Sequence, residues 1–185
     1  MKRPKGFHPR RRGDFLSLFS KIDTALKQEG QKADVILLGG ASVVLLGFRE
    51  RATGDIDIVA GASAGLFCKT AEGIGIPTDV VTVSSTVDFE EAPKTIVFQG
   101  KNLTVRSIKA EELIKLKLER FRKQDPEDIY AILEKSKISF DQFVSLVKQM
   151  LPDFVGNPKT VILSAQIVVE HLYPENVNFL AKLSD

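Results

Sequence analysis

Two short segments of the chain carry residues whose types and spacing suit phosphate chemistry. The first is Leu38-Gly39-Gly40-Ala41-Ser42. A glycine pair lets the backbone turn tightly and lets a ligand approach it closely. Where a helix begins after such a turn, its unpaired amides attract an anion, and a serine hydroxyl adds a further donor. We therefore predict that Gly39, Gly40 and Ser42 contact a phosphate group.

The second segment, Asp55-Ile56-Asp57-Ile58-Val59, alternates polar and apolar residues as a β-strand does. Asp55 and Asp57 then project from the same face, and two carboxylates so close repel each other unless a cation lies between them. Oxygen ligands of this kind suit Mg²⁺, or Mn²⁺ in its place. Asp79 begins a further predicted strand and would supply a third carboxylate to the metal. The pattern predicts metal-assisted phosphoryl or nucleotidyl transfer, with Asp79 helping to deprotonate the acceptor.

The strands that must position these residues follow from the spacing of apolar side chains. The apolar run 35–38 is typical of a buried strand, and the alternation over 55–59 and 78–83 predicts two more. The runs 95–98 and 103–105 flank Gln99-Gly100-Lys101-Asn102, which is typical of a hairpin.

Helical periodicity accounts for most of the remaining chain. Helices are predicted at 14–28, 41–46, 63–72, 109–123, 125–134, 139–151 and 157–172, with a last short one from Pro174. Together with the strands they predict an α/β (α+β) fold, a small mixed sheet flanked by helices with a C-terminal helical extension. Residues 1–13 are predicted to be a basic, disordered arm, 14–106 the α/β core and 107–185 the helical extension packed on it.

The composition of the 185-residue chain narrows the classes of function. Hydrophobic residues make up 43% and charged residues 27%, which argues against disorder over the whole length. Cys68 is the only cysteine, so a cysteine-rich zinc site is excluded, and we expect Cys68 in the core. The longest uncharged apolar stretch, 35–48, is too short to span a membrane, and no apolar signal segment follows the N-terminus. We therefore expect a cytoplasmic protein with no membrane partner.

Basic residues are concentrated at the N-terminus, although the net charge of the chain is only +2. Residues 1–12 hold Lys and Arg side chains and no acidic one, which leaves a mildly acidic body. An arm of this kind either binds nucleic acid or is a solvated tail.

In order and spacing, the motifs resemble the nucleotidyltransferase fold of the DNA polymerase β superfamily. That fold has an apolar strand, then Gly-Gly or Gly-Ser, then a helix, and then a strand that carries Asp-x-Asp. The chain is more narrowly similar to small bacterial nucleotidyltransferases of the AbiEii abortive-infection toxin type. Their Arg-x-Ser/Thr-x-Asp-x-Asp motif is matched by Arg51, Thr53, Asp55 and Asp57. Their later Lys-Leu helix and Asp-x-x-Asp helix start are matched by Lys117-Leu118 and 125–128.

The resemblance implies that an NTP is the substrate and that Arg51 and Lys117 bind it, with Lys117 over the triphosphate. The alternative for Lys117 is a solvated cationic helix face, paired with glutamates at helical spacing. Asp125 is predicted to cap the next helix. Asp128 either orients Lys117 or faces solvent.

The sequence thus predicts a Mg²⁺-dependent nucleotidyltransferase that moves a nucleoside monophosphate from an NTP to an acceptor. RNA, a protein side chain and a small hydroxylated molecule all remain open as acceptors. The resemblance adds a role as the toxin of a toxin–antitoxin or abortive-infection system, with an antitoxin as partner. The alternative is a non-catalytic module of the same fold that binds RNA or an antitoxin partner.

Overall fold

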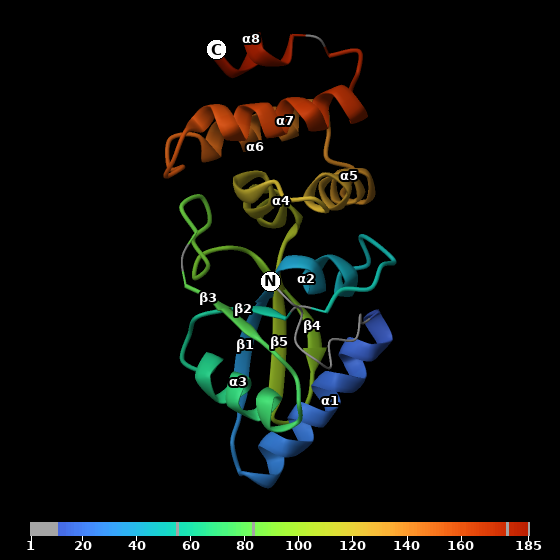
Figure 1. Ribbon diagram of the computed structural model, residues 1–185, viewed down its shortest axis with the longest axis vertical. Coiled ribbons are helices and arrows are strands. Elements are labelled where there is room, and N and C mark those ends of the chain that lie inside the picture. The colour runs from blue at the N-terminus through green and yellow to red at the C-terminus, as the bar shows by residue number, and fades with distance from the viewer. Residues whose placement is uncertain (1–10, 55, 83, 177, 185) are drawn as a thin grey trace. The chain divides into compact units, whose positions relative to one another are not determined.

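The computed structural model describes residues 11–54, 56–82, 84–176 and 178–184. These residues form eight helices and a five-stranded mixed sheet (Figure 1), which confirms the predicted fold class. They fall into two compact units, which we call the sheet unit (residues 1–82 and 93–108) and the helical unit (residues 83–92 and 109–185). Most of the predicted basic arm lies outside the described residues.

The sheet has the strand order β3-β2-β1-β5-β4. At its centre, β1 (Ala33–Leu38) and β5 (Leu103–Ile108) run parallel, and β4 (Lys94–Gln99) forms the predicted hairpin with β5. On the other side, β2 (Asp57–Val59) is antiparallel to β1, and β3 (Asp79–Val81) is parallel to β2. The three strands predicted from the two chemical segments and from Asp79 are therefore neighbours in one sheet.

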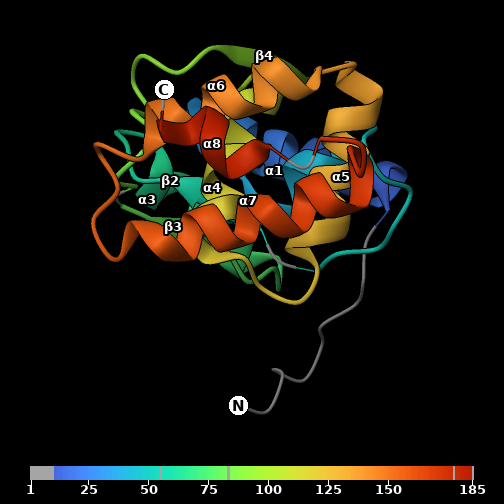
Figure 2. The same ribbon diagram turned by 90° about the horizontal axis from the view of Figure 1, so that it is seen from above.

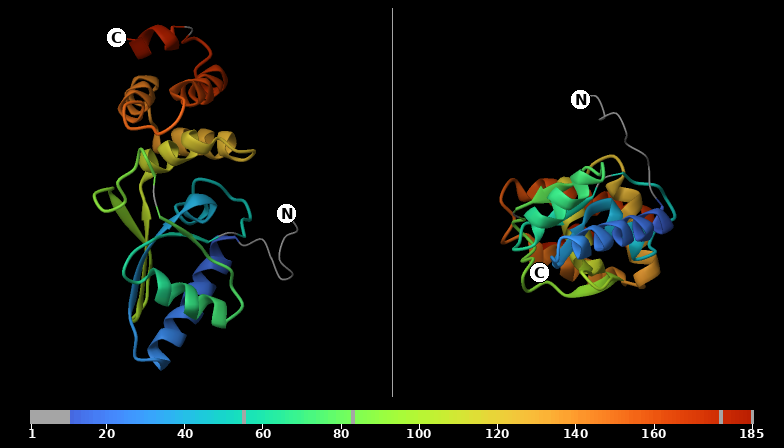
Figure 3. Two further views of the ribbon diagram at one scale, coloured as in Figure 1. Left: turned by 60° about the vertical axis from the view of Figure 1, so that its left-hand side comes forward. Right: turned by 90° about the horizontal axis from the view of Figure 1, so that it is seen from below.

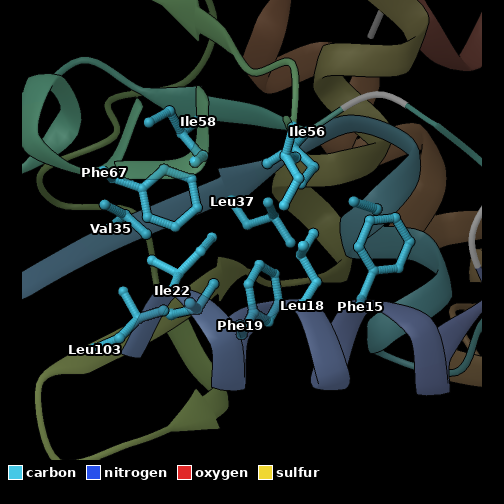
Figure 4. Close-up of a cluster of buried hydrophobic side chains, with 14 of the residues drawn as sticks. Phe15, Leu18, Phe19, Ile22, Val35, Leu37, Ile56, Ile58, Phe67 and Leu103 are labelled. Atoms are coloured by element: carbon cyan, nitrogen blue, oxygen red, sulfur yellow. The ribbon is translucent and has the colours of Figure 1, made fainter. Parts of the chain in front are cut away.

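Two helices cover one face of this sheet, α1 (Arg12–Gln28) and α3 (Ala64–Gly73) (Figure 3). The buried residues of α1 recur at helical spacing, so its apolar stripe faces the sheet: Phe15, Leu18, Phe19, Ile22 and Leu26. Figure 4 shows this stripe meeting Leu37 of β1 and Phe67 of α3. Cys68 is partly buried against the same cluster, which confirms its expected place at the core. The short helix α2 (Gly39–Leu45) follows β1 without a loop.

The helical unit contains α4 (Ala110–Arg120), α5 (Asp125–Ser136), α6 (Phe140–Met150), α7 (Pro158–Leu172) and α8 (Phe179–Ser184). Local chemistry sets several of their ends: Ser139 caps α6 by accepting a hydrogen bond from the Gln142 amide, and Asn157 caps α7. Figure 2 shows α8 lying between α6 and α7, and it contacts both. The last helix starts at Phe179 and not at Pro174 as predicted.

Residues 84–86 were predicted to lie in the α/β core, but they are bound to α4 of the helical unit. The Glu119 carboxylate accepts hydrogen bonds from the Ser85 and Thr86 hydroxyls at 2.9 and 2.7 Å and from the Thr86 amide at 3.0 Å. Ser84 Oγ donates to the same carboxylate at 3.2 Å. One acidic side chain therefore attaches this loop to α4, a contact that no local pattern in the sequence reveals.

None of the helices in the described part of the chain has the length and apolar character that crossing a bilayer requires.

Candidate functional site

The glycine turn lies where β1 ends and α2 begins. Gly39 has φ +65°, a left-handed conformation that side chains other than glycine adopt at a cost. A Cβ placed on Gly39 would also overlap the carboxylate of Asp57. The first glycine is therefore required twice, once for the turn and once because Asp57 lies directly against the backbone.

The second glycine lies beneath two side chains of the segment that follows α2. A Cβ on Gly40 would lie 2.8 Å from Thr53 Oγ1 and 2.9 Å from Arg51 Nη2. The structure thus brings Arg51 to the turn, and its binding of the nucleotide stays a prediction. Thr53 was not among the predicted site residues, although it is buried here. Its position in the Arg-x-Thr-x-Asp-x-Asp motif was the signal that could have identified it.

Ser42 lies in the first turn of α2, and it is fully buried. Its hydroxyl has no hydrogen-bond partner among the described residues. An unsatisfied buried hydroxyl costs about 1–3 kcal/mol, so it calls for a partner such as a bound ligand or water. The predicted contact between Ser42 and phosphate stays a prediction, and the unsatisfied hydroxyl is in accord with it.

Two of the three aspartates predicted to hold a metal are paired across two parallel strands. Asp57 of β2 and Asp79 of β3 are directly paired in register. Residues paired in this way point to the same face of a sheet, on strands about 4.8 Å apart. Asp57 is partly exposed and Asp79 is exposed, so a ligand can reach both. Two like charges directly opposite each other destabilise the sheet unless a cation bridges them.

Asp55 lies outside the described residues, so its predicted place beside Asp57 stays a prediction. Among the residues that are described, no three Asp, Glu, His or Cys side chains converge as a metal site. The two described carboxylates, Asp57 and Asp79, are oxygen donors of the kind that Mg²⁺ or Mn²⁺ prefers. In donor chemistry they fit the predicted ion.

Lys117, in the helical unit, has a different environment from the solvated helix face considered as its alternative. The residue is 1% exposed, and Nζ donates to Asp125 Oδ1 at 3.0 Å and to Asp128 Oδ2 at 2.7 Å. Asp128 is completely buried, so its solvent-facing alternative is wrong and its predicted contact with Lys117 is confirmed. The binding of the nucleotide by Lys117 stays a prediction.

Asp125 does not cap α5 as predicted, because the helix starts at Asp125 itself after Gln124. Its carboxylate instead accepts hydrogen bonds from Lys117, from Arg120 and from the Arg122 amide. Burial alone would raise the pKa of Asp125, but the charge of Lys117 and the hydrogen bond and charge of Arg120 outweigh it, so the pKa lies below its ordinary value. This carboxylate is ionised and neutralised within the unit.

Comparison with known protein families identifies the family of this chain. Residues 13–157 match a family described as nucleotidyltransferase of unknown function (DUF6036). The chain belongs to this nucleotidyltransferase family. The resemblance to nucleotidyltransferases drawn from the sequence is thereby confirmed, while the narrower one to the AbiEii type stays a prediction. No curated protein and no solved structure matches the chain.

In this nucleotidyltransferase, the match includes both chemical segments and the Lys117 network. The structure brings four of the predicted site residues together in the sheet unit: Gly39, Gly40, Arg51 and Asp57. The register of β2 and β3 adds Asp79 to them. A backbone turn, a guanidinium and two carboxylates are the groups needed to bind a nucleotide's phosphates through a metal ion.

Proposed function

We propose that the protein transfers a nucleoside monophosphate from an NTP to an acceptor, in a reaction that depends on Mg²⁺ or Mn²⁺. Membership of a nucleotidyltransferase family supports the reaction class. The observation that carries the metal dependence is the in-register pair of Asp57 and Asp79 beside the glycine turn. Opposed carboxylates on neighbouring strands repel each other, and a bound cation would relieve that repulsion.

In this proposal, separate residues of the sheet unit bind the metal and the phosphates. Asp55, Asp57 and Asp79 hold the metal, which when bound offsets negative charge on the phosphates. Gly39, Gly40 and Ser42 bind the β and γ phosphates, and Arg51 donates to the same group.

The transfer itself requires one proton acceptor. An oxygen of the acceptor attacks the α-phosphorus, the bond from that phosphorus to the pyrophosphate oxygen breaks, and pyrophosphate leaves with the bonding electron pair. Asp79 accepts the proton of the attacking hydroxyl, and its exposed position lets an acceptor reach it. Lys117 over the triphosphate and a toxin role with an antitoxin partner rest on the sequence resemblance alone.

The test is transfer of label from an α-³²P-labelled NTP to total cell RNA or to total protein, with and without Mg²⁺. We expect labelling that requires the metal and is lost in Asp57→Asn/Asp79→Asn, while the folded state persists. Labelling without metal, or labelling that survives the double substitution, would refute the proposal. NTP binding without transfer to any fraction would favour the non-catalytic module.

A further inference from the structure

A cavity of about 380 Å³ lies in the sheet unit, and arginine side chains dominate its lining. Arg11 and Arg12 come from the start of α1, and Arg49 and Arg51 from the segment after α2. Glu50 is the one acidic residue among the described residues of the lining. We call this cavity the arginine pocket. Its volume lies in the range of sites that bind small molecules or single nucleotide units, rather than a lone ion.

The charge of the arginine pocket selects an anion. Four of the described lining residues are arginines and one is a glutamate, and guanidinium is the side chain best suited to paired hydrogen bonds with phosphate oxygens. Arg12 is held in place because its Nε donates to the Leu45 carbonyl at 3.2 Å. That carbonyl belongs to the last turn of α2, so the guanidinium of Arg12 lies beside the end of that helix.

Arg51 connects the arginine pocket to the proposed nucleotide site. It lines the pocket, and its Nη2 also lies over Gly40 at the other end of α2. From Gly40 to Val44, which also lines the pocket, the helix rises only about 6 Å. A ligand in the pocket therefore lies close to the glycine turn without occupying it, and Arg51 is shared between the two.

We infer that the arginine pocket binds the phosphodiester backbone of a single-stranded RNA, which is the acceptor in the transfer reaction. This inference rests on the proposed function. Repeated phosphates match several guanidinium groups in one cavity, whereas a protein acceptor or a neutral hydroxylated molecule offers no such charge. The chain that leads into Arg11 is basic as well, with no acidic residue in 1–12.

The test compares Arg11→Gln/Arg49→Gln with a control that removes the same charge elsewhere on the same unit. Lys21→Gln/Lys27→Gln serves as the control, because both lysines are exposed on α1 outside the pocket. Binding of a fluorescent single-stranded RNA of mixed sequence is measured by anisotropy at two salt concentrations, and binding of Mg²⁺-ATP is measured separately. Neither measurement requires turnover, so failure of the labelling assay and failure of this inference are distinguishable.

We expect the pocket variant to lose RNA affinity about tenfold at low salt. The slope of the logarithm of RNA affinity against the logarithm of salt concentration should become shallower by about 1.4. RNA binding by the control variant and the ATP affinity of the pocket variant should be unchanged. An equal loss in both variants, no loss in the pocket variant, or a loss of ATP affinity without one of RNA affinity would overturn the inference. Should the double variant fail to fold, Arg11→Gln alone carries the test. Arg11 is exposed, and we expect a loss of about threefold.

Discussion

Aspartate pairs occur in both units of the molecule, in opposite electrostatic settings. In the helical unit, Asp125 and Asp128 are buried and share the ammonium group of Lys117. In the sheet unit, Asp57 and Asp79 are paired in register on neighbouring strands and are open to solvent. The first pair shares a buried cation of its own unit, whereas the second places two carboxylates on one face of the sheet where solvent reaches them. The comparison separates carboxylates that hold the protein together from carboxylates suited to bind a cation.

The largest effect is expected from two of the carboxylates proposed to hold the metal, Asp55 and Asp57. Asp55→Asn/Asp57→Asn should lower transfer by at least about 10³-fold, because the residues that hold the metal are lost. The free energy of unfolding without metal should stay the same or rise slightly, since like-charge repulsion is relieved. Label transfer and urea unfolding measure the two effects. Full transfer by this variant would mean that these carboxylates do not serve the reaction.

Removing the cation of the buried network should instead reduce stability. Lys117→Met leaves Asp125 and Asp128 buried without their shared cation, which typically costs about 3–5 kcal/mol. Lys115→Met is the matched control, because the partner of Lys115 among the described residues is Glu112, one turn away at 3.2 Å. Urea unfolding compares the two variants. Equal stability of both would show that the buried pair does not depend on Lys117.

Gly39 distinguishes a required glycine from an ordinary one in the same unit. Gly39→Ala should destabilise the protein by about 1–2 kcal/mol or more, because φ is positive and the new Cβ meets Asp57. Gly65→Ala is the control, since a Cβ there meets nothing within 4 Å on helix α3. It should stabilise by about 0.5–1 kcal/mol. Thermal unfolding of both variants tests whether Gly39→Ala lowers stability and Gly65→Ala raises it.

Lowering the pH should remove the contribution of Asp125 to the free energy of unfolding. The pKa of Asp125 lies below its ordinary value of 3.8, so its contribution to stability is complete above that value and is lost as pH falls through the lowered pKa. We expect the unfolding free energy of the wild type to fall more steeply in this acid range than that of Asp125→Asn. Asp153→Asn, an exposed position, should follow the wild type. Parallel curves for Asp125→Asn and the wild type would contradict the assigned shift.

The smallest effect is expected at Ser42. Ser42→Ala removes a buried hydroxyl that has no partner in the described residues, so stability should be unchanged or rise by up to about 1 kcal/mol. Affinity for Mg²⁺-NTP should fall about tenfold if that hydroxyl donates to phosphate. Ser164→Ala is the control, because its hydroxyl bonds the Thr160 carbonyl at 2.8 Å and its loss should cost about 1 kcal/mol. Unchanged NTP affinity in Ser42→Ala would remove Ser42 from the site.

The sequence by itself determined the secondary structure around the proposed site. Alternation around Asp57 and the apolar run before Gly39 predicted strands correctly, since both patterns report which face of a strand is buried. The stripe of Phe15, Phe19 and Ile22 predicted α1 for the same reason. The order of these motifs also indicated the nucleotidyltransferase family, which the match over residues 13–157 shows.

Only the tertiary structure decided which distant residues meet. Asp57 and Asp79 are 22 positions apart, and no local pattern states that β2 and β3 pair at these residues. The contacts of Lys117 were equally hidden, because charged side chains at helical spacing predict a solvated face unless a buried carboxylate is packed against them. Spacing along the chain reports local periodicity, whereas register and burial depend on contacts that form when the chain folds back on itself.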